Sequence, residues 1–237
     1  MGFNHLIGNK DPFFKNAPRY VFNAVFDDML FKRLIKFVKE APKENYFAFV
    51  ETVSMHGHYY DPRTKTHSFD ETVKTFDINF TNFMRDLDQT DFFKNGGLLV
   101  VTGDHRVMGT MSAEEIREMG FFAPQSVPLV IFGDLPYKIN RNKHFSHVDL
   151  HYSLQYLLMK EPERHQYQRN IFSHEPDREF FCSFYQQLVD TSVVLFNTTD
   201  KAGKIRLNGD KTEIICPELT AEEEKKVESF LVWMRTR

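Results

Sequence analysis

The sequence predicts a three-layer α/β fold with a mostly parallel sheet over about residues 20–165, then a small strand-rich appendage with a terminal helix over about 190–237. Up to residue 165, short apolar runs alternate with amphipathic stretches of helical period, as in a sheet covered by helices. These runs are nearly continuous, which is typical of strands buried on both faces. Beyond that point the chain becomes charged and irregular, and short runs are joined by Gly203 and Asn208-Gly209.

Two amphipathic helices and three buried strands are expected in the first part of the chain, after a loop-like start over residues 1–20. The apolar face of the first helix consists of Phe26, Leu30, Leu34 and Phe37. Asp27 and Asp28 lie near its N-terminal end, where acidic side chains are favoured. The face of the second helix consists of Val73, Phe76, Phe80, Phe83 and Leu87. The strands are expected at 46–53, 98–102 and 127–132.

Capping patterns predict three further helices. Ser112 with Glu115 starts one that ends at Gly120, Ser146 with Asp149 starts a second, and Thr220 with Glu223 starts the terminal helix. Short strands are expected at 193–196, 205–207 and 212–215, and the Asn208-Gly209 pair predicts a hairpin between the last two.

Composition excludes some classes of protein. The 237 residues carry a net charge of −3, which does not support general nucleic-acid binding, and no apolar run is long enough for a membrane-spanning helix. No signal peptide is expected, because Met1-Gly2 leads straight into polar sequence. The 25 phenylalanines should mostly be buried. Cys182 and Cys216 do not have metal-ligand spacing, and their disulfide state is left open.

The Asp104-His105 pair is the first candidate site. It follows the apolar run 98–101 and a Thr102-Gly103 turn, so it is expected where a buried strand leaves the sheet. In open α/β sheets, ligands bind beyond the carboxyl ends of the strands. A carboxylate and an imidazole together suit zinc, manganese or magnesium. The alternative is a polar loop with a surface histidine.

A second polar segment, residues 52–62, leaves the end of the expected strand 46–53. If both strands belong to one parallel sheet, His56 and the Asp104-His105 pair lie at the same edge. His56 or His58 would then donate a hydrogen bond to an anionic oxygen or complete a metal site. The alternative is a solvated loop with an aromatic plug.

Several segments, taken in order, resemble the sulfatase branch of the alkaline phosphatase superfamily, and most closely its lipoteichoic-acid synthase-like phosphoglycerol transferases. Residues 52–62 resemble the T-x-S-x-H-x-P-Y segment, and residues 101–105 resemble the metal-binding segment. Residues 127–131 are similar to a P-L-I-I strand, and 146–154 to an S-x-x-D-I-x-P-T-L helix start. The opening residues 1–3 and 27–31 are similar to the sequence that precedes the histidine strand. The resemblance covers most of residues 1–165.

The resemblance implies an alkaline phosphatase-like fold, a divalent metal at Asp104 and His105, and an anion-contacting role for His56. The metal would be manganese, zinc, magnesium or calcium, and the substrate a phosphate or sulfate ester. The family's Thr, Ser or modified Cys nucleophile, and its first acidic ligand, precede the region that matches residue 1. Thr52, Ser54 and Thr102 do not match the nucleophile motif.

We therefore expect residues 1–237 to be one sulfatase-like domain that lacks its N-terminal part. Little turnover is expected from it, together with self-association or pairing with a separate N-terminal segment. The family's members act outside the cytoplasmic membrane and are membrane-anchored; the location of this chain is left open.

Three functions are compatible with this sequence. The first is a metal-dependent phosphoryl or sulfuryl ester hydrolase, or a phosphoglycerol-type transferase, that is incomplete. The second is a metallophosphoesterase that uses metal-bound water. The third is an inactive sulfatase-like module that binds an anionic glycan or a protein partner.

Overall fold

The computed structural model describes most of the chain, in two compact units. The described residues are 4–41, 45–57, 59–61, 64–105, 127–135, 137–139, 145–158, 170–172, 181–186, 192–197, 202–208, 211–215 and 219–235. The first unit comprises Met1–Leu99 with Phe132–Asp134, and the second comprises Val100–Ile131 with Leu135–Arg237. The expected helix at 112–120 lies outside the described residues.

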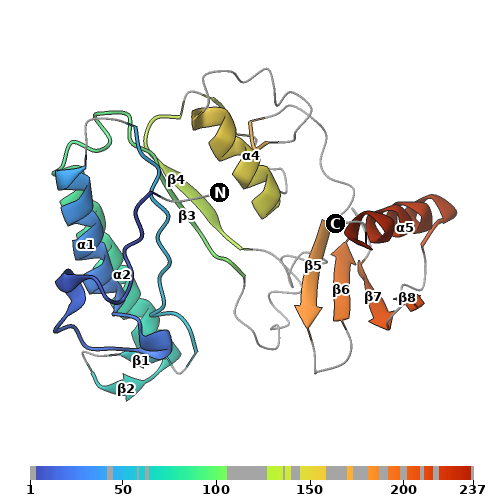
Figure 1. Cartoon of the computed structure of the whole chain (residues 1–237), viewed down its shortest axis with the longest axis horizontal. Helices are drawn as coiled ribbons and strands as arrows, with labels where there is room; N and C mark the ends of the chain where they lie inside the picture. The colour runs from blue at the N-terminus through green and yellow to red at the C-terminus, as the bar shows by residue number, and fades with distance from the viewer. Residues whose placement is uncertain are drawn as a thin grey trace. The chain divides into compact units, whose positions relative to one another are not determined.

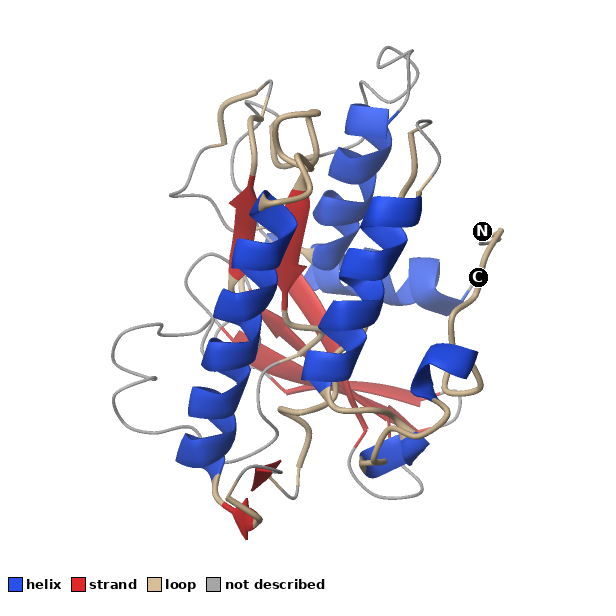
Figure 2. Cartoon of the chain, turned by 90° about the vertical axis from the view of Figure 1, so that its left-hand side faces the viewer, coloured by secondary structure: helices blue, strands red, loops and turns tan. Residues whose placement is uncertain are grey.

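The first unit is built on two helices that pack side by side (Figures 1 and 2). Two short 3₁₀ helices, Pro12–Phe14 and Val21–Asn23, precede α1 (Asp27–Glu40). A small antiparallel hairpin of β1 (Tyr60–Asp61) and β2 (Thr66–His67) leads into α2 (Phe69–Asp88). Both helices lie where the sequence predicts them. The predicted face of α2 includes its buried Phe83 and Leu87, whereas the buried apolar residues of α1 are Phe31 and Ile35, which were not on its predicted face.

The core of this unit lies between α1 and α2. Phe31 and Ile35 of α1 pack with Phe83 and Leu87 of α2, and all four are buried. The rings of Phe31 and Phe83 are stacked with their centroids 4.8 Å apart. Burial of such side chains stabilises the fold by about 1.5–3 kcal/mol each. The two helices therefore cover each other's apolar faces.

The second pair of strands is β3 (Leu99–Thr102) and β4 (Leu129–Phe132), which pair with each other. These two strands confirm the ones predicted from the sequence at 98–102 and 127–132. α4 (His147–Leu158) follows in the second unit and starts at the predicted Ser146–Asp149 cap. The Asp149 Oδ2 atom accepts hydrogen bonds from the Ser146 backbone N–H, at 2.8 Å, and from the Ser146 hydroxyl, at 3.1 Å.

The C-terminal part of the second unit is a four-stranded antiparallel sheet followed by a helix. Its strands, in order along the chain and across the sheet, are β5 (Phe181–Gln186), β6 (Ser192–Asn197), β7 (Ala202–Asn208) and β8 (Lys211–Ile215). Asn208 pairs with Lys211, which agrees with the hairpin predicted there. α5 (Ala221–Arg235) starts at the predicted cap, where the Glu223 carboxylate accepts a hydrogen bond from the Thr220 backbone N–H at 2.7 Å.

The prediction of a three-layer fold with a mostly parallel sheet is wrong. The described strands form three separate sheets, of which β1–β2 and β5–β8 are antiparallel. Residues 46–53, expected to be a buried strand, are irregular backbone. Phe49 in this segment is 69% exposed, and Phe47 is 46% exposed, so the segment is not a buried strand. The helices do contact strand residues: Leu99 of β3 packs against the core between α1 and α2, and the rings of Phe80 and Phe132 lie 6.3 Å apart. Among the described strands, however, β3 and β4 form a separate pair and are not part of one continuous sheet.

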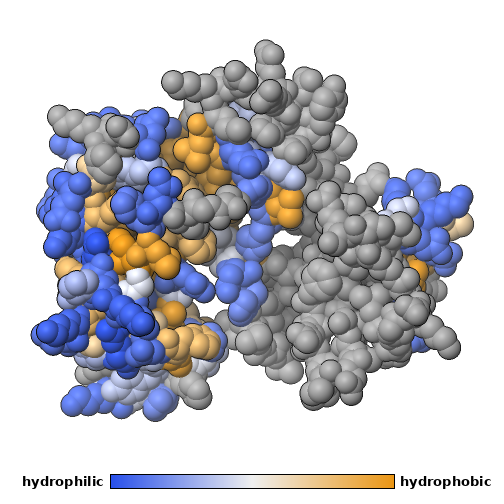
Figure 3. Space-filling model, viewed as in Figure 1, coloured by the Kyte–Doolittle hydropathy of each residue, from blue (hydrophilic) through white to orange (hydrophobic). Residues whose placement is uncertain are grey.

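Apolar side chains also reach the surface of the first unit (Figure 3). The large exposed ones there include Leu6, Phe22, Phe47, Phe49, Phe69 and Ile78. Within the described part of the chain, no helix is long and apolar enough to cross a membrane.

Candidate functional site

The turn after β3 brings Gly103, Asp104 and His105 to the surface of the second unit. Gly103 lies in a close approach of backbone and side chains: an added Cβ would be 3.3 Å from the His105 carbonyl oxygen and 3.4 Å from the Val127 Cβ. A larger residue would therefore fit only if these neighbours moved slightly. The apolar run of β3 and the small residue after it together explain why the acid and the imidazole emerge at this point.

Asp104 and His105 contact each other. The Asp104 Oδ1 atom accepts a hydrogen bond from the His105 backbone N–H at 2.9 Å, and Oδ2 lies 3.5 Å from the His105 Nε2. The side chains are 82% and 55% exposed, respectively. An exposed pair of this kind adds at most about 1 kcal/mol to stability. Its carboxylate and imidazole are accessible to a ligand from solvent.

His147, which the sequence analysis did not select, also reaches this turn. Its Nε2 lies 2.8 Å from the Gly103 carbonyl oxygen. The residue is the first of α4, directly after the Ser146 cap. Only the cap was visible in the sequence, because the contact joins residues 44 positions apart.

The donors present suit a divalent ion in type but are few in number. Carboxylate and imidazole are ligands for manganese and zinc, and zinc sites usually have at least three protein ligands. Among the described residues, no group of three histidine, cysteine, aspartate or glutamate side chains could hold a metal ion. Asp104 and His105 are therefore two donors of a suitable type, which is fewer than such a site usually has, and an ion would be held only weakly by them.

His56, the predicted anion contact, lies in the first unit and is exposed. Its ring packs edge-to-face on Phe22, with the centroids 4.7 Å apart. The Tyr20 hydroxyl donates toward the carbonyl oxygens of His56 and Gly57, at 3.4 and 3.2 Å. Since residues 46–53 are not a strand, the strand-end argument that placed His56 beside Asp104-His105 does not hold. Its role as an anion contact stays a prediction; His58 lies outside the described residues.

The buried Asp27 side chain holds the segment that leads to His56. Its Oδ1 atom accepts hydrogen bonds from the backbone N–H groups of Val53, at 3.0 Å, and Ser54, at 3.3 Å. The Asp27 N–H in turn donates to the Ser54 hydroxyl oxygen at 3.2 Å. Burial raises the pKa of the Asp27 carboxyl, and these hydrogen bonds from Val53 and Ser54 offset only part of that rise.

The three hydroxyls near the expected site differ in accessibility. Ser54 is buried and bonded to Asp27, so it is not available to a substrate. Thr52 is exposed. Thr102 is also exposed and donates to the Gly103 carbonyl oxygen at 3.3 Å.

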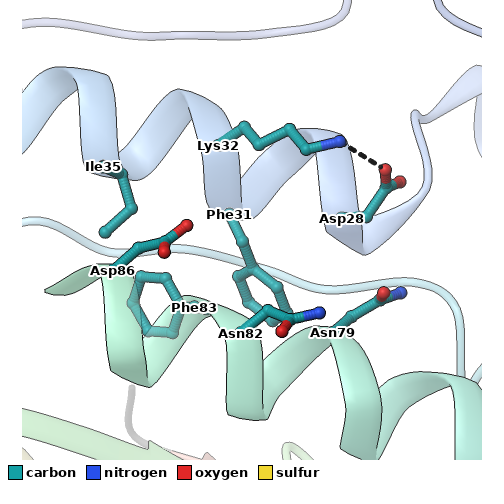
Figure 4. A pocket seen from close by; sticks show the side chains of 8 residues that line it. All are labelled: Asp28, Phe31, Lys32, Ile35, Asn79, Asn82, Phe83 and Asp86. Atoms are coloured by element: carbon teal, nitrogen blue, oxygen red, sulfur yellow. Dashed lines mark hydrogen bonds and ion pairs between the residues drawn. The ribbon is translucent and has the colours of Figure 1, made fainter.

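A separate hollow lies between α1 and α2 (Figure 4). Phe31 and Phe83 lie at its base, and an Asp28–Lys32 ion pair of 3.1 Å lies at its rim. The other lining residues are Ile35, Asn79, Asn82 and Asp86. None of the sequence-predicted site residues lines it.

No known protein family matches the chain, and no curated protein matches it either. The sulfatase resemblance is therefore carried by the motifs alone.

Proposed function

We propose that this chain is a sulfatase-like module that binds a divalent cation with Asp104 and His105 and takes a phosphate or sulfate ester as its ligand. The single observation that carries the proposal is the contact between these two exposed side chains at the end of β3. The ordered motifs that resemble the sulfatase branch support the same assignment. When bound, the ion would supply positive charge to the anionic oxygens of the ester.

Asp104 and His105 have distinct roles in this proposal. The carboxylate provides the negative charge that hard cations prefer, and the imidazole provides a nitrogen ligand. The hydrogen bond from the His105 backbone N–H restrains the Asp104 carboxylate beside the ring. With only two protein ligands, the affinity for the ion should be weak.

The first candidate is an enzyme, whose reaction is ester hydrolysis or a phosphoglycerol-type transfer. A metal-bound water as the attacking group would require no side-chain hydroxyl. The second candidate is an inactive module that binds an anionic glycan or a protein partner. The burial of Ser54 favours this candidate, because it removes one of the three hydroxyls considered as nucleophiles.

Calorimetry with Mn²⁺ and Zn²⁺ tests the cation site. We expect the wild-type chain to bind at least one ion, and Asp104→Ala to lose most of that affinity. Asp77→Ala is the matched control, because Asp77 is an exposed aspartate on α2 and should leave binding unchanged. Equal binding by wild type and Asp104→Ala would remove Asp104 from the site.

Turnover separates the two candidate functions. A chromogenic sulfate, a phosphate monoester and a phosphodiester would be assayed with and without Mn²⁺. Metal-dependent turnover that Asp104→Ala abolishes would support the enzyme. Metal binding without turnover of any of the three would favour the binding module.

A further inference from the structure

Residues 46–52 combine the sequence of a strand with a backbone that has no strand beside it. The segment is rich in aromatic and β-branched residues, and it has one charge, no proline and no glycine, as is typical of segments that pair with other chains. Within the described part of the chain, no backbone N–H or C=O between Ala48 and Thr52 is hydrogen-bonded to another residue. These groups are therefore open to a second strand, like those at the edge of a sheet.

The segment is held at both ends on the first unit, and residues 45–53 run without a turn or bend. At one end, the ring of Tyr46 packs edge-to-face on Phe37 of α1, with the centroids 5.2 Å apart. At the other end, the Asp27 carboxylate accepts the hydrogen bond from the Val53 N–H at 3.0 Å. A segment anchored in this way loses less conformational entropy when it pairs with a partner.

Side-chain exposure along the segment follows the period of a strand except at the small Ala48, which is exposed. Phe47 and Phe49 are exposed, whereas Tyr46 and Val50 are half-buried. One face of the segment thus presents two accessible aromatic rings to solvent, and the opposite face lies against the first unit at Tyr46.

We propose that residues 46–52 become a β-strand by pairing antiparallel with the same residues of a second copy of this chain. A two-fold axis that passes perpendicular to the paired strands keeps the exposed face of each copy on the same side. The interface is then isologous, so one segment supplies both halves of it. The backbone groups that are open in one copy pair with the same groups of the other.

The side chains select the register of this pairing. An axis through Ala48 places Phe47 of each copy opposite Phe49 of the other, and directly opposite aromatic pairs stabilise antiparallel strands. Glu51, the single charge of the segment, then faces the amide of Asn45 rather than a second carboxylate. An axis through Phe49 would instead place Phe47 opposite Glu51. The segment is therefore complementary to itself in shape and charge, and this argues for a second copy as the occupant.

Disulfide trapping tests this register, in a background where the two native cysteines are replaced by Cys182→Ser and Cys216→Ser. Ala48→Cys places two thiols across the axis, where facing Cα atoms lie about 4.5–5.5 Å apart and a disulfide can form. We expect mild oxidation to link most of this variant into a dimer. Thr52→Cys is the matched control, because Thr52 is also exposed, but its two copies would lie about 27 Å apart along the strands and should not be linked.

Sedimentation of two lysine variants provides a readout that does not depend on thiols. Phe49→Lys removes both aromatic pairs and puts a charge on the pairing edge, which opposes strand addition. We expect its dimer dissociation constant to rise about 10-fold or more. Ile78→Lys is the control, because Ile78 is an exposed apolar residue of α2 outside the segment, and this variant should associate as the wild type does.

Four outcomes would overturn the proposal. The first is equal cross-linking of Ala48→Cys and Thr52→Cys, which would indicate random collision. The second is a wild-type chain that associates but is unaffected by Phe49→Lys, which would place the interface elsewhere, for example at the edges of β3 and β4. The third is an equal loss of association in Ile78→Lys. The fourth is a wild-type chain that stays monomeric at every concentration, which would leave the segment to an extended peptide of another protein.

Discussion

Replacing Asp27 with alanine should destabilise the first unit. The side chain is fully buried, and it accepts hydrogen bonds from the N–H groups of Val53 and Ser54. An unsatisfied buried donor costs about 1–3 kcal/mol, and the lower end applies to Val53, which is only partly buried. Leaving both N–H groups without an acceptor therefore lowers the free energy of unfolding by about 2–4 kcal/mol, before any compensating effect is counted. The substitution also removes a carboxylate whose burial is unfavourable, and this reduces the destabilisation. We therefore expect Asp27→Ala to lower the free energy of unfolding by about 1–3 kcal/mol in total.

The pH dependence of the Asp27→Asn variant tests the sign of the electrostatic contribution. Burial raises the pKa of Asp27 in the folded protein, so its contribution to stability is present at acid pH and is lost as pH rises through that raised pKa. Asparagine has a similar volume, keeps one accepting oxygen and does not ionise. The deficit of Asp27→Asn relative to wild type should therefore be largest below about pH 4 and should shrink toward neutral pH.

Urea unfolding followed by circular dichroism between pH 4 and 7 measures both effects. Asp27→Ala should have a lower unfolding midpoint than Asp27→Asn at every pH. Stability of Asp27→Ala within about 0.5 kcal/mol of wild type would refute the hydrogen-bond argument. A deficit of Asp27→Asn that grows as pH rises would refute the sign of the pKa shift.

Three further outcomes are expected. Phe83→Ala should cost about 3–5 kcal/mol in urea unfolding, since Phe83 is 3% exposed, whereas Phe49→Ala should change stability little; similar losses for both would contradict the assigned core. His56→Ala should weaken the binding of inorganic phosphate or sulfate measured by calorimetry, and unchanged affinity would remove His56 as an anion contact. Sedimentation at low micromolar concentration should show self-association, because among the described strands β3 and β4 pair only with each other, and open sheet edges invite pairing; a concentration-independent monomer would contradict this.

The elements that the sequence by itself determined depend on residues close together in the chain. The positions of α1 and α2 and the buried face of α2 follow from helical spacing, although the same spacing did not select Phe31 and Ile35 in α1. The starts of α4 and α5 follow from the Ser146–Asp149 and Thr220–Glu223 pairs. β3, β4 and the β7–β8 hairpin were likewise predicted from short runs and a turn pair. The Asp104–His105 contact joins neighbouring residues, and so it was also within reach of the sequence.

The tertiary structure alone decided which apolar surfaces cover one another. Residues 46–53 have the composition of a buried strand, but strand formation needs a partner, and composition does not specify one. The contacts of Asp27 with Val53 and of His147 with Gly103 join residues 26 and 44 positions apart, which no local pattern reports. The packing of α1 on α2, and of Phe80 of α2 on Phe132 of β4, likewise joins segments that are distant in the sequence. Hydrophobic burial is non-directional, so an amphipathic face specifies that it must be covered and leaves the covering surface to the rest of the fold.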